Sequence, residues 1–229
     1  MDIYAVRGRS LAQRAVLTAG LGLCVAAAWW LLVGGGIAFV GGWMGWRWVA
    51  GDEVRRVGLG VGLSIYFVRV LFTQFAFLKR AVGWAEVGAI VPWVGFIFGL
   101  LAICGGRNTE AFGVVGWIGV AMFGVGSWMN SYSEYARERW KRRAENKGRL
   151  YTGGLYRWSR HPNYLGDLVS FSGLCLMAGC WWTGVVPVVM LAGFVFANIP
   201  MLDAHLREHY GEEFEAYARR TRRLVPFVY

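Results

Sequence analysis

The sequence predicts an all-α, multi-pass membrane protein: a bundle of about six transmembrane helices with an amphipathic C-terminal helix in the cytoplasm. Of its 229 residues, 56% are hydrophobic and only 17% are charged, whereas soluble domains are typically about 45–50% apolar and about 25% charged. The apolar residues also gather in runs of membrane-spanning length. Because no linker divides the chain, we predict one integral membrane domain over residues 1–229, with four spans in 1–129 and a more polar half in 130–229.

Four apolar runs of spanning length make up the N-terminal part. The first covers about residues 15–40, and tryptophans typical of a membrane boundary follow it. The second, about 57–78, carries a single charge, Arg69. The third and fourth cover about 81–104 and 111–129. Each run contains enough residues for a helix that crosses the bilayer core.

The last apolar stretch, residues 164–200, is too long for one span. Thr183, Gly184 and Pro187 near its middle predict a hairpin of two helices. This gives six spans, or five if the stretch re-enters without crossing. Residues 201–229 then form a charged, amphipathic tail.

Basic residues predict the orientation. With the N-terminus in the cytoplasm, nineteen Lys and Arg residues lie on the cytoplasmic side and four on the other, namely Arg47, Arg55, Arg56 and Arg107. This is a strong positive-inside bias. We therefore expect both termini in the cytoplasm, the lipid bilayer as the main partner, and the endoplasmic reticulum or a bacterial inner membrane as the location. The net charge of +10 is explained by this orientation and does not indicate nucleic acid.

The most polar segment of the chain, residues 130–167, lies between two apolar runs. Asn130 and Glu134 recur at the spacing of one helix face. Pro162 suits the first turn of a helix, whose N-terminus attracts anions, and Arg160 adds a bidentate donor for phosphate or carboxylate. We predict that a charged, soluble cofactor binds here, on the cytoplasmic face.

Other charged residues have a structural explanation beside a functional one. Arg69 lies deep in a span, where an ionisable group costs about 2.5–3.5 kcal/mol on insertion scales and is usually paired or functional. Tyr66, three residues earlier, shares its helix face. Arg69 could instead pair with Glu86 or with a backbone carbonyl, and the sequence leaves this open. Residues 141–143 are typical of a stretch beside lipid headgroups.

A metal site is not predicted. The four cysteines lie within or at the ends of apolar runs without ligand spacing, and we expect reduced thiols. His205 and His209 are one helical turn apart, but no third ligand is evident. We expect instead that this tail helix covers the cofactor, with Arg207 and Tyr217 directed inward.

The stretch GGLYRWSRHPNYLGD, residues 153–167, resembles the steroid 5α-reductase C-terminal domain superfamily (DUF1295-like), which is related to sterol reductases and isoprenylcysteine carboxyl methyltransferases. Further segments resemble the reductase branch, namely residues 66–69, 130–134, 214–217 and 224–227. The resemblance covers the last hundred residues well and the first hundred poorly. The Gln-Glu pair of the reductase branch has no clear counterpart in this sequence.

The resemblance implies NADPH as the cofactor and Tyr66 as the acid that hydrogen-bonds a substrate carbonyl, with Arg69 near the nicotinamide. Glu86 is the second candidate catalytic residue. The remaining predicted cofactor-binding residues are Asn130, Glu134, Arg157, Arg160, His161, Asn163, Tyr164, Asp167, Arg207 and Tyr217.

Three functions are compatible with these patterns. The first is an NADPH-dependent reductase of a conjugated carbon–carbon double bond in a lipid or steroid-like substrate. The alternative is a methyltransferase that uses S-adenosylmethionine on a lipid or a prenylated cysteine carboxyl. A non-catalytic, lipid-binding protein is the third. Both enzymes would act on a small lipophilic substrate, and no obligate protein partner is evident.

Overall fold

The computed structural model describes residues 10–78 and 80–229, and the regular elements in this part of the chain are helices. Five of them are long and apolar enough to cross a membrane: α1 (Leu11–Val33), α3 with its π-helical end (Glu53–Phe77), α4 (Trp84–Arg107), α5 (Gly113–Lys141) and the continuous helix Trp181–Tyr210. A sixth, α6 (Pro162–Ala178), has 17 residues, which is at the lower limit of spanning length. The prediction of an all-α, multi-pass membrane protein is confirmed.

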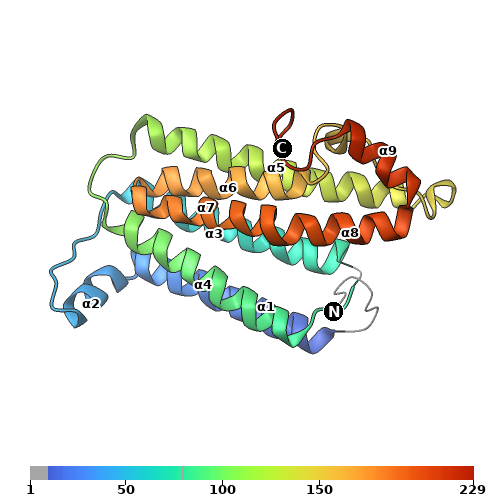
Figure 1. Ribbon diagram of the computed structural model, residues 1–229. Coiled ribbons are helices and arrows are strands. Elements are labelled where there is room, and N and C mark those ends of the chain that lie inside the picture. The colour runs from blue at the N-terminus through green and yellow to red at the C-terminus, as the bar shows by residue number, and fades with distance from the viewer. Residues whose placement is uncertain (1–9, 79) are drawn as a thin grey trace. The chain divides into compact units, whose positions relative to one another are not determined.

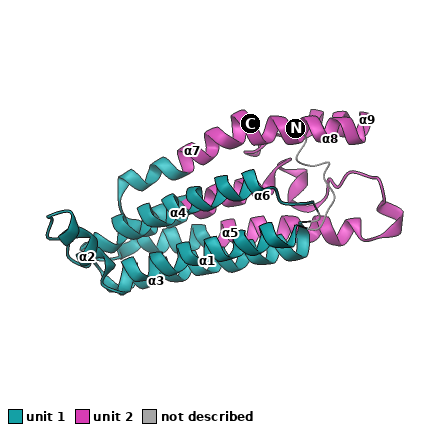
Figure 2. Ribbon diagram, turned by 90° about the horizontal axis from the view of Figure 1, so that it is seen from below, with its two compact units in different colours: residues 1–123, 172–186 teal, residues 124–171, 187–229 magenta. Residues whose placement is uncertain are grey.

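The helices are grouped into two compact units, which Figure 2 shows in different colours. Unit 1 comprises the chain up to Phe123 together with Ser172–Val186, and unit 2 comprises Gly124–Phe171 and Pro187–Tyr229. The boundaries fall inside α5, α6 and α7 (Val185–Gly193). The single-domain organisation stays a prediction.

In unit 1, α1 packs against α3 and α4, and α3 also packs against α4; Figure 1 shows α1 and α4 side by side. The contact surfaces are built from aliphatic and aromatic side chains that are almost completely buried, among them Leu21, Leu59, Leu63, Phe98 and Leu101. Because these side chains belong to long apolar helices, the apolar runs of the sequence predict α1, α3 and α4.

The sequence predicts one helix over residues 15–40, but the first apolar run forms two. Helix α1 ends at Val33, and the short α2 (Gly36–Trp43) follows. Gly35 adopts a left-handed conformation with φ 83°, which a residue without a Cβ adopts easily. The Arg56 guanidinium donates to the carbonyl of Leu32 at 2.9 Å and so satisfies one of the acceptors that the end of α1 exposes.

Unit 2 contains the polar segment. Helix α5 continues past the apolar run to Lys141, so that Asn130 and Glu134 are helical, and α6 begins at Pro162 as predicted. The last apolar stretch is divided into two helices as predicted, because α6 ends at Ala178 and the last long helix begins at Trp181. The position predicted for the turn is wrong: the chain breaks at Gly179, whose φ is 63°, whereas Thr183, Gly184 and Pro187 lie within the second helix.

The tail is divided into two helices rather than one amphipathic segment. The π-helical stretch Phe194–Asn198 and α8 (Ile199–Tyr210) continue the last apolar helix. Helix α9 (Glu212–Arg220) follows after Gly211, whose φ is 50°. Helix α9 buries Phe214 and Tyr217 in a small core, so the predicted amphipathic C-terminal helix is α9.

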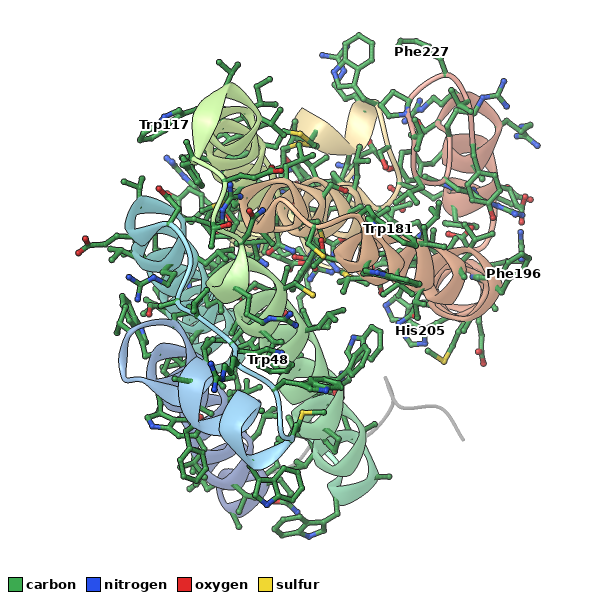
Figure 3. All side chains as sticks on the ribbon, turned by 90° about the vertical axis from the view of Figure 1, so that its left-hand side faces the viewer. Trp48, Trp117, Trp181, Phe196, His205 and Phe227 are labelled. Carbon is green, nitrogen blue, oxygen red and sulfur yellow. The ribbon has the colours of Figure 1, made fainter. Side chains whose placement is uncertain are left out.

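Aromatic side chains on the outer surface fit a lipid environment. Trp117 of α5 is 61% exposed and Phe196 of the last long helix is 81% exposed, and Figure 3 shows both directed away from the helices that carry them. Such exposure is costly in water but expected in contact with lipid. The orientation in the membrane stays a prediction. Three of the basic residues on which it rests, Arg7, Arg9 and Lys79, lie outside the described residues.

Helices α5 and α6 approach each other backbone to backbone at glycines. In unit 2, a Cβ placed on Gly126 would lie 2.4 Å from the amide nitrogen of Ser170 and 2.5 Å from the carbonyl oxygen of Gly166. In unit 1, a Cβ on Gly119 would lie 2.6 Å from the carbonyl oxygen of Gly173. Close packing of membrane helices through small residues is the usual way in which such helices associate.

We therefore expect Gly126→Val to lower the melting temperature of the detergent-solubilised protein strongly. Backbone atoms cannot move aside as flexible side chains can, and overpacking typically costs about 1–3 kcal/mol. Gly124→Val is the matched control, because a Cβ on Gly124 meets nothing within 4 Å. Equal melting temperatures of the two variants would contradict the close approach.

Candidate functional site

The segment before α6 is held in place by the C-terminal end of the chain. The amide of Arg160 donates to the carbonyl of Arg222 at 2.8 Å, and the amide of His161 donates to the carbonyl of Arg223 at 3.1 Å. The Ser159 hydroxyl also donates to the Arg223 carbonyl, at 3.3 Å. These bonds fix the backbone that carries the two predicted cofactor-binding residues Arg160 and His161.

Asp203 of α8 joins the side chains of these two residues. Its Oδ1 lies 2.9 Å from His161 Nε2, and its Oδ2 lies 2.9 Å from Arg160 Nη2. All three side chains are buried. An acid that bridges two partners in this way fixes the ring orientation of the histidine and the direction of the guanidinium.

Asp203 was not among the residues predicted from the sequence, because it lies in a tail rich in exposed charges. The signal that could have found it is its spacing from Ile199. The two residues are one helical turn apart and are the buried residues of α8, so they share a face. An acid one turn after a buried aliphatic residue, at the end of an apolar helix, indicates an inward-facing charge that needs a partner.

Arg160 keeps one donor available. Its Nε is buried and has no hydrogen-bond partner among residues 10–78 and 80–229. Burial lowers the pKa of the Arg160 guanidinium, and the charge of Asp203 opposes this shift. A buried donor without an acceptor is costly, so a ligand oxygen at this position would stabilise the site.

A second polar cluster connects α5 with the start of α6. The Asn163 amide donates to Glu134 Oε1 at 3.1 Å, and the Asn130 amide donates to the carbonyl of Asn163, also at 3.1 Å. Arg137 binds the other oxygen of Glu134, Oε2, at 2.6 Å. The structure thus brings together three predicted residues and adds Arg137, whose spacing of three from Glu134 is that of a helical ion pair.

Stacked rings lie beside this cluster. The ring of Tyr164 stacks on His161, with centroids 5.4 Å apart, and on Phe194, with centroids 4.6 Å apart. Asp167 follows Asn163 by one turn of α6, as expected, and is partly buried. Together, the start of α6 presents amide, carboxylate and aromatic groups within one and a half turns.

The remaining predicted cofactor-binding residues of unit 2 differ in their exposure. Tyr217 is buried and its hydroxyl donates to the carbonyl of Tyr156 at 2.7 Å. Burial raises the pKa of both tyrosines, so their hydroxyls remain neutral donors near neutral pH. Arg157 is exposed. Arg207 is paired with Glu215 and its side chain is 56% exposed, so the expectation that Arg207 is directed inward is wrong.

Tyr66, Arg69 and Glu86 belong to unit 1. The Arg69 guanidinium lies 4.9 Å from the centroid of the Tyr66 ring, as their spacing on one helix face predicts. The Tyr66 ring also packs edge-on against Phe98, with centroids 5.9 Å apart. Both oxygens of Glu86 accept hydrogen bonds from Arg80, at 2.6 and 2.7 Å. The acid that we considered as a partner of Arg69 is therefore paired with Arg80.

The chain is similar to a known protein family and to several known proteins. The model of a family described as "Protein of unknown function (DUF1295)" matches residues 86–221, which is more than half of the chain. A probable O-methyltransferase, ustE, of Ustilaginoidea virens is 29% identical over 181 residues, covering 69% of this chain and 63% of that protein.

Two further relatives match shorter parts. A probable protein-S-isoprenylcysteine O-methyltransferase of Oryza sativa subsp. indica is 33% identical over 84 residues, covering 37% of this chain and 44% of that protein. The 3-oxo-5-alpha-steroid 4-dehydrogenase 2 of Homo sapiens is 26% identical over 112 residues, covering 49% of this chain and 42% of that protein. The chain thus spans less than two thirds of the length of each of these relatives.

Proposed function

We propose, from the premise that this chain belongs to the DUF1295 family, that it is a membrane-embedded, NADPH-dependent reductase of a conjugated carbon–carbon double bond in a lipid or steroid-like substrate. It is an integral membrane protein, and the relatives described above are named as enzymes, two O-methyltransferases and a steroid dehydrogenase. Its own activity is inferred from Tyr66 and Arg69 of unit 1 and from the polar residues of unit 2.

The observation that carries the proposal is the pairing of Tyr66 with Arg69. Addition of a hydride to a conjugated enone leaves negative charge on the carbonyl oxygen, and a positioned donor at that oxygen lowers the barrier. A phenol with a guanidinium 4.9 Å from its ring centroid is such a donor, because the cation stabilises the charge that develops nearby. Methyl transfer to a carboxylate oxygen requires no acid.

The residues of unit 2 fit the proposed cofactor. The buried Nε of Arg160 has no acceptor in the described part of the chain, and a phosphate oxygen is a suitable one. The amides of Asn130 and Asn163 are donors of the kind that bind phosphate oxygens, and the Glu134 carboxylate is an acceptor of the kind that binds ribose hydroxyls. When bound, NADPH would supply the hydride.

A methyltransferase that uses S-adenosylmethionine is the second candidate. It is supported by the alignment with the probable O-methyltransferase of Ustilaginoidea virens, which extends over 69% of this chain. The Nε donor of Arg160, which has no acceptor among the residues that the structure describes, would suit the methionine carboxylate of that cofactor as well. The Tyr66–Arg69 pair has no role in this reaction, and for this reason we place it second.

We further propose that the cofactor site faces the cytoplasm, in the endoplasmic reticulum or a bacterial inner membrane, because nineteen of the basic residues would lie on that side. The substrate would be a small lipophilic molecule that enters from the bilayer. No nucleic acid and no obligate protein partner are part of the proposal.

Cofactor binding tests the proposal directly. The melting temperature of the detergent-solubilised protein is measured with NADPH and with S-adenosylmethionine separately. We expect NADPH alone to raise it, because a ligand at about 100 times its Kd stabilises the folded state by about 2.7 kcal/mol. Stabilisation by S-adenosylmethionine alone would replace the proposal by the second candidate, and no stabilisation by either would reject the site.

Arg160→Lys shows whether the binding uses this site. Lysine keeps a positive charge beside Asp203 but lacks the planar fork of arginine. We expect this variant to lose most of the stabilisation by NADPH. Arg149→Lys is the matched control, since Arg149 is exposed, and it should respond to NADPH like the unmodified protein.

A further inference from the structure

Unit 1 contains a cavity of about 440 Å³ at the point where several of its helices begin or end. Its wall includes Arg55 from the first turn of α3, the first turn of α5 (113–116), and Cys175 and Gly179 from the end of α6. Trp181, where the last long helix begins, completes it. None of these residues belongs to the site described above.

Arg55 is a buried cation in this wall, with only 3% of its surface exposed. Its Nη1 donates to the carbonyl of Met177 at 2.7 Å, and its Nη2 donates to the carbonyls of Glu110 and Ala111, each at 3.2 Å. Its Nε is buried without a hydrogen-bond partner in the described part of the chain. No carboxylate of residues 10–78 and 80–229 forms an ion pair with it, so its charge is compensated by these carbonyl groups and by the ring of Phe112, whose centroid lies 5.6 Å from the guanidinium carbon.

The first turn of α5 presents a second attraction for an anion on the same cavity. The first backbone N–H groups of a helix have no partner within it, and the helix dipole places positive charge at that end. Within the described part of the chain, the first amide of α5 that has an acceptor is that of Gly116, which donates to the carbonyl of Phe112 at 3.2 Å. A helix N-terminus beside an arginine is a favourable site for an oxyanion.

The rest of the lining is mostly apolar. Phe112, Val115, Leu176 and Trp181 contribute to the wall, and Trp181 is 76% exposed, which is typical of a tryptophan at a membrane boundary. A free inorganic anion would leave these surfaces in contact with water. A molecule with an anionic head and an apolar body would cover them.

We propose that this cavity binds the anionic headgroup of a membrane amphiphile, with its phosphate or carboxylate oxygens on Arg55 and on the N-terminus of α5. Arg55 was predicted to lie on the membrane side that has only four basic residues, so few other cations there would compete for an anionic headgroup. The site is independent of the proposed cofactor and substrate, because its residues are separate from those that carry the proposed reaction.

Matched ligands separate the headgroup from the apolar part. Protein purified in an uncharged detergent is titrated with phosphatidic acid, with diacylglycerol, with oleate and with inorganic phosphate, and binding is followed by native mass spectrometry. We expect phosphatidic acid or oleate to bind and diacylglycerol, which lacks the anion, to bind at least about tenfold more weakly. Equal binding of diacylglycerol, or equally tight binding of inorganic phosphate, would overturn the proposal.

Substitutions at Val114 assign the binding to this cavity without removing Arg55, whose contacts also support the end of α6. Val114 lines the cavity and is 75% exposed, and an acid is well tolerated in the first turn of a helix. Val114→Asp should weaken the binding of the anionic ligand about tenfold or more, because the new carboxylate repels it. Val114→Asn should retain the binding, since asparagine has nearly the same shape as aspartate but no charge. Equal affinities of the two variants would refute the assignment.

Discussion

Tyr66→Phe is expected to slow reduction of a conjugated lipid enone by about 100- to 1,000-fold, which is the usual effect of removing one donor to a developing oxyanion. Phenylalanine keeps the ring that packs against Phe98 and lies beside Arg69, so that only the hydroxyl is lost. Folding and NADPH binding should therefore remain unchanged. The measurement is NADPH consumption by the purified protein at saturating cofactor, with the variant and the unmodified protein compared on the same substrate.

Tyr132→Phe is the control for this experiment. Tyr132 is 40% exposed and its ring stacks on Trp128, with centroids 5.3 Å apart, so that phenylalanine preserves its packing as well. We expect full activity from it. If Tyr66→Phe were as active as this control, Tyr66 would not be the acid, and a methyl-transfer assay should then be equally insensitive to the substitution.

The spans were predictable because their cause is local. A run of apolar residues of sufficient length forms a helix in lipid whatever its neighbours are, and Pro162 indicated the start of α6 from its own backbone chemistry. The break after Val33 was not predictable in the same way. Glycines are common in transmembrane helices, and what ends α1 includes the Arg56 side chain, which comes from another helix.

In the candidate site, too, the features with a local cause were predictable and those that depend on tertiary contacts were not. Asn130, Glu134 and Asn163 were predicted as one group because a single polar segment contains them, and the structure joins them by hydrogen bonds. Glu86 had two possible arginine partners within twenty residues, Arg69 and Arg80. Which of them pairs depends on how the chain turns before α4, and Arg80 pairs with it. Such choices are tertiary, so no pattern in the sequence decides them.

Asp203→Asn is expected to lower the free energy of unfolding by about 3–5 kcal/mol, because removing one partner of a buried ion pair leaves the other charge uncompensated. Arg160 is that charge, and its side chain is only 7% exposed. Asparagine has nearly the same shape as aspartate, so the loss would arise from charge and not from a cavity. Chemical denaturation in mixed micelles measures it.

Glu208→Gln on the same helix is the control, since Glu208 is exposed and its neutralisation should change stability little. The decisive second measurement is NADPH affinity under conditions in which the variant remains folded. Asp203 orients both Arg160 and His161, so a positioning role predicts weaker NADPH binding as well as lower stability. A variant that is less stable but binds NADPH with unchanged affinity would show that Asp203 supports the fold only. The cofactor would then not depend on the orientation of Arg160 and His161.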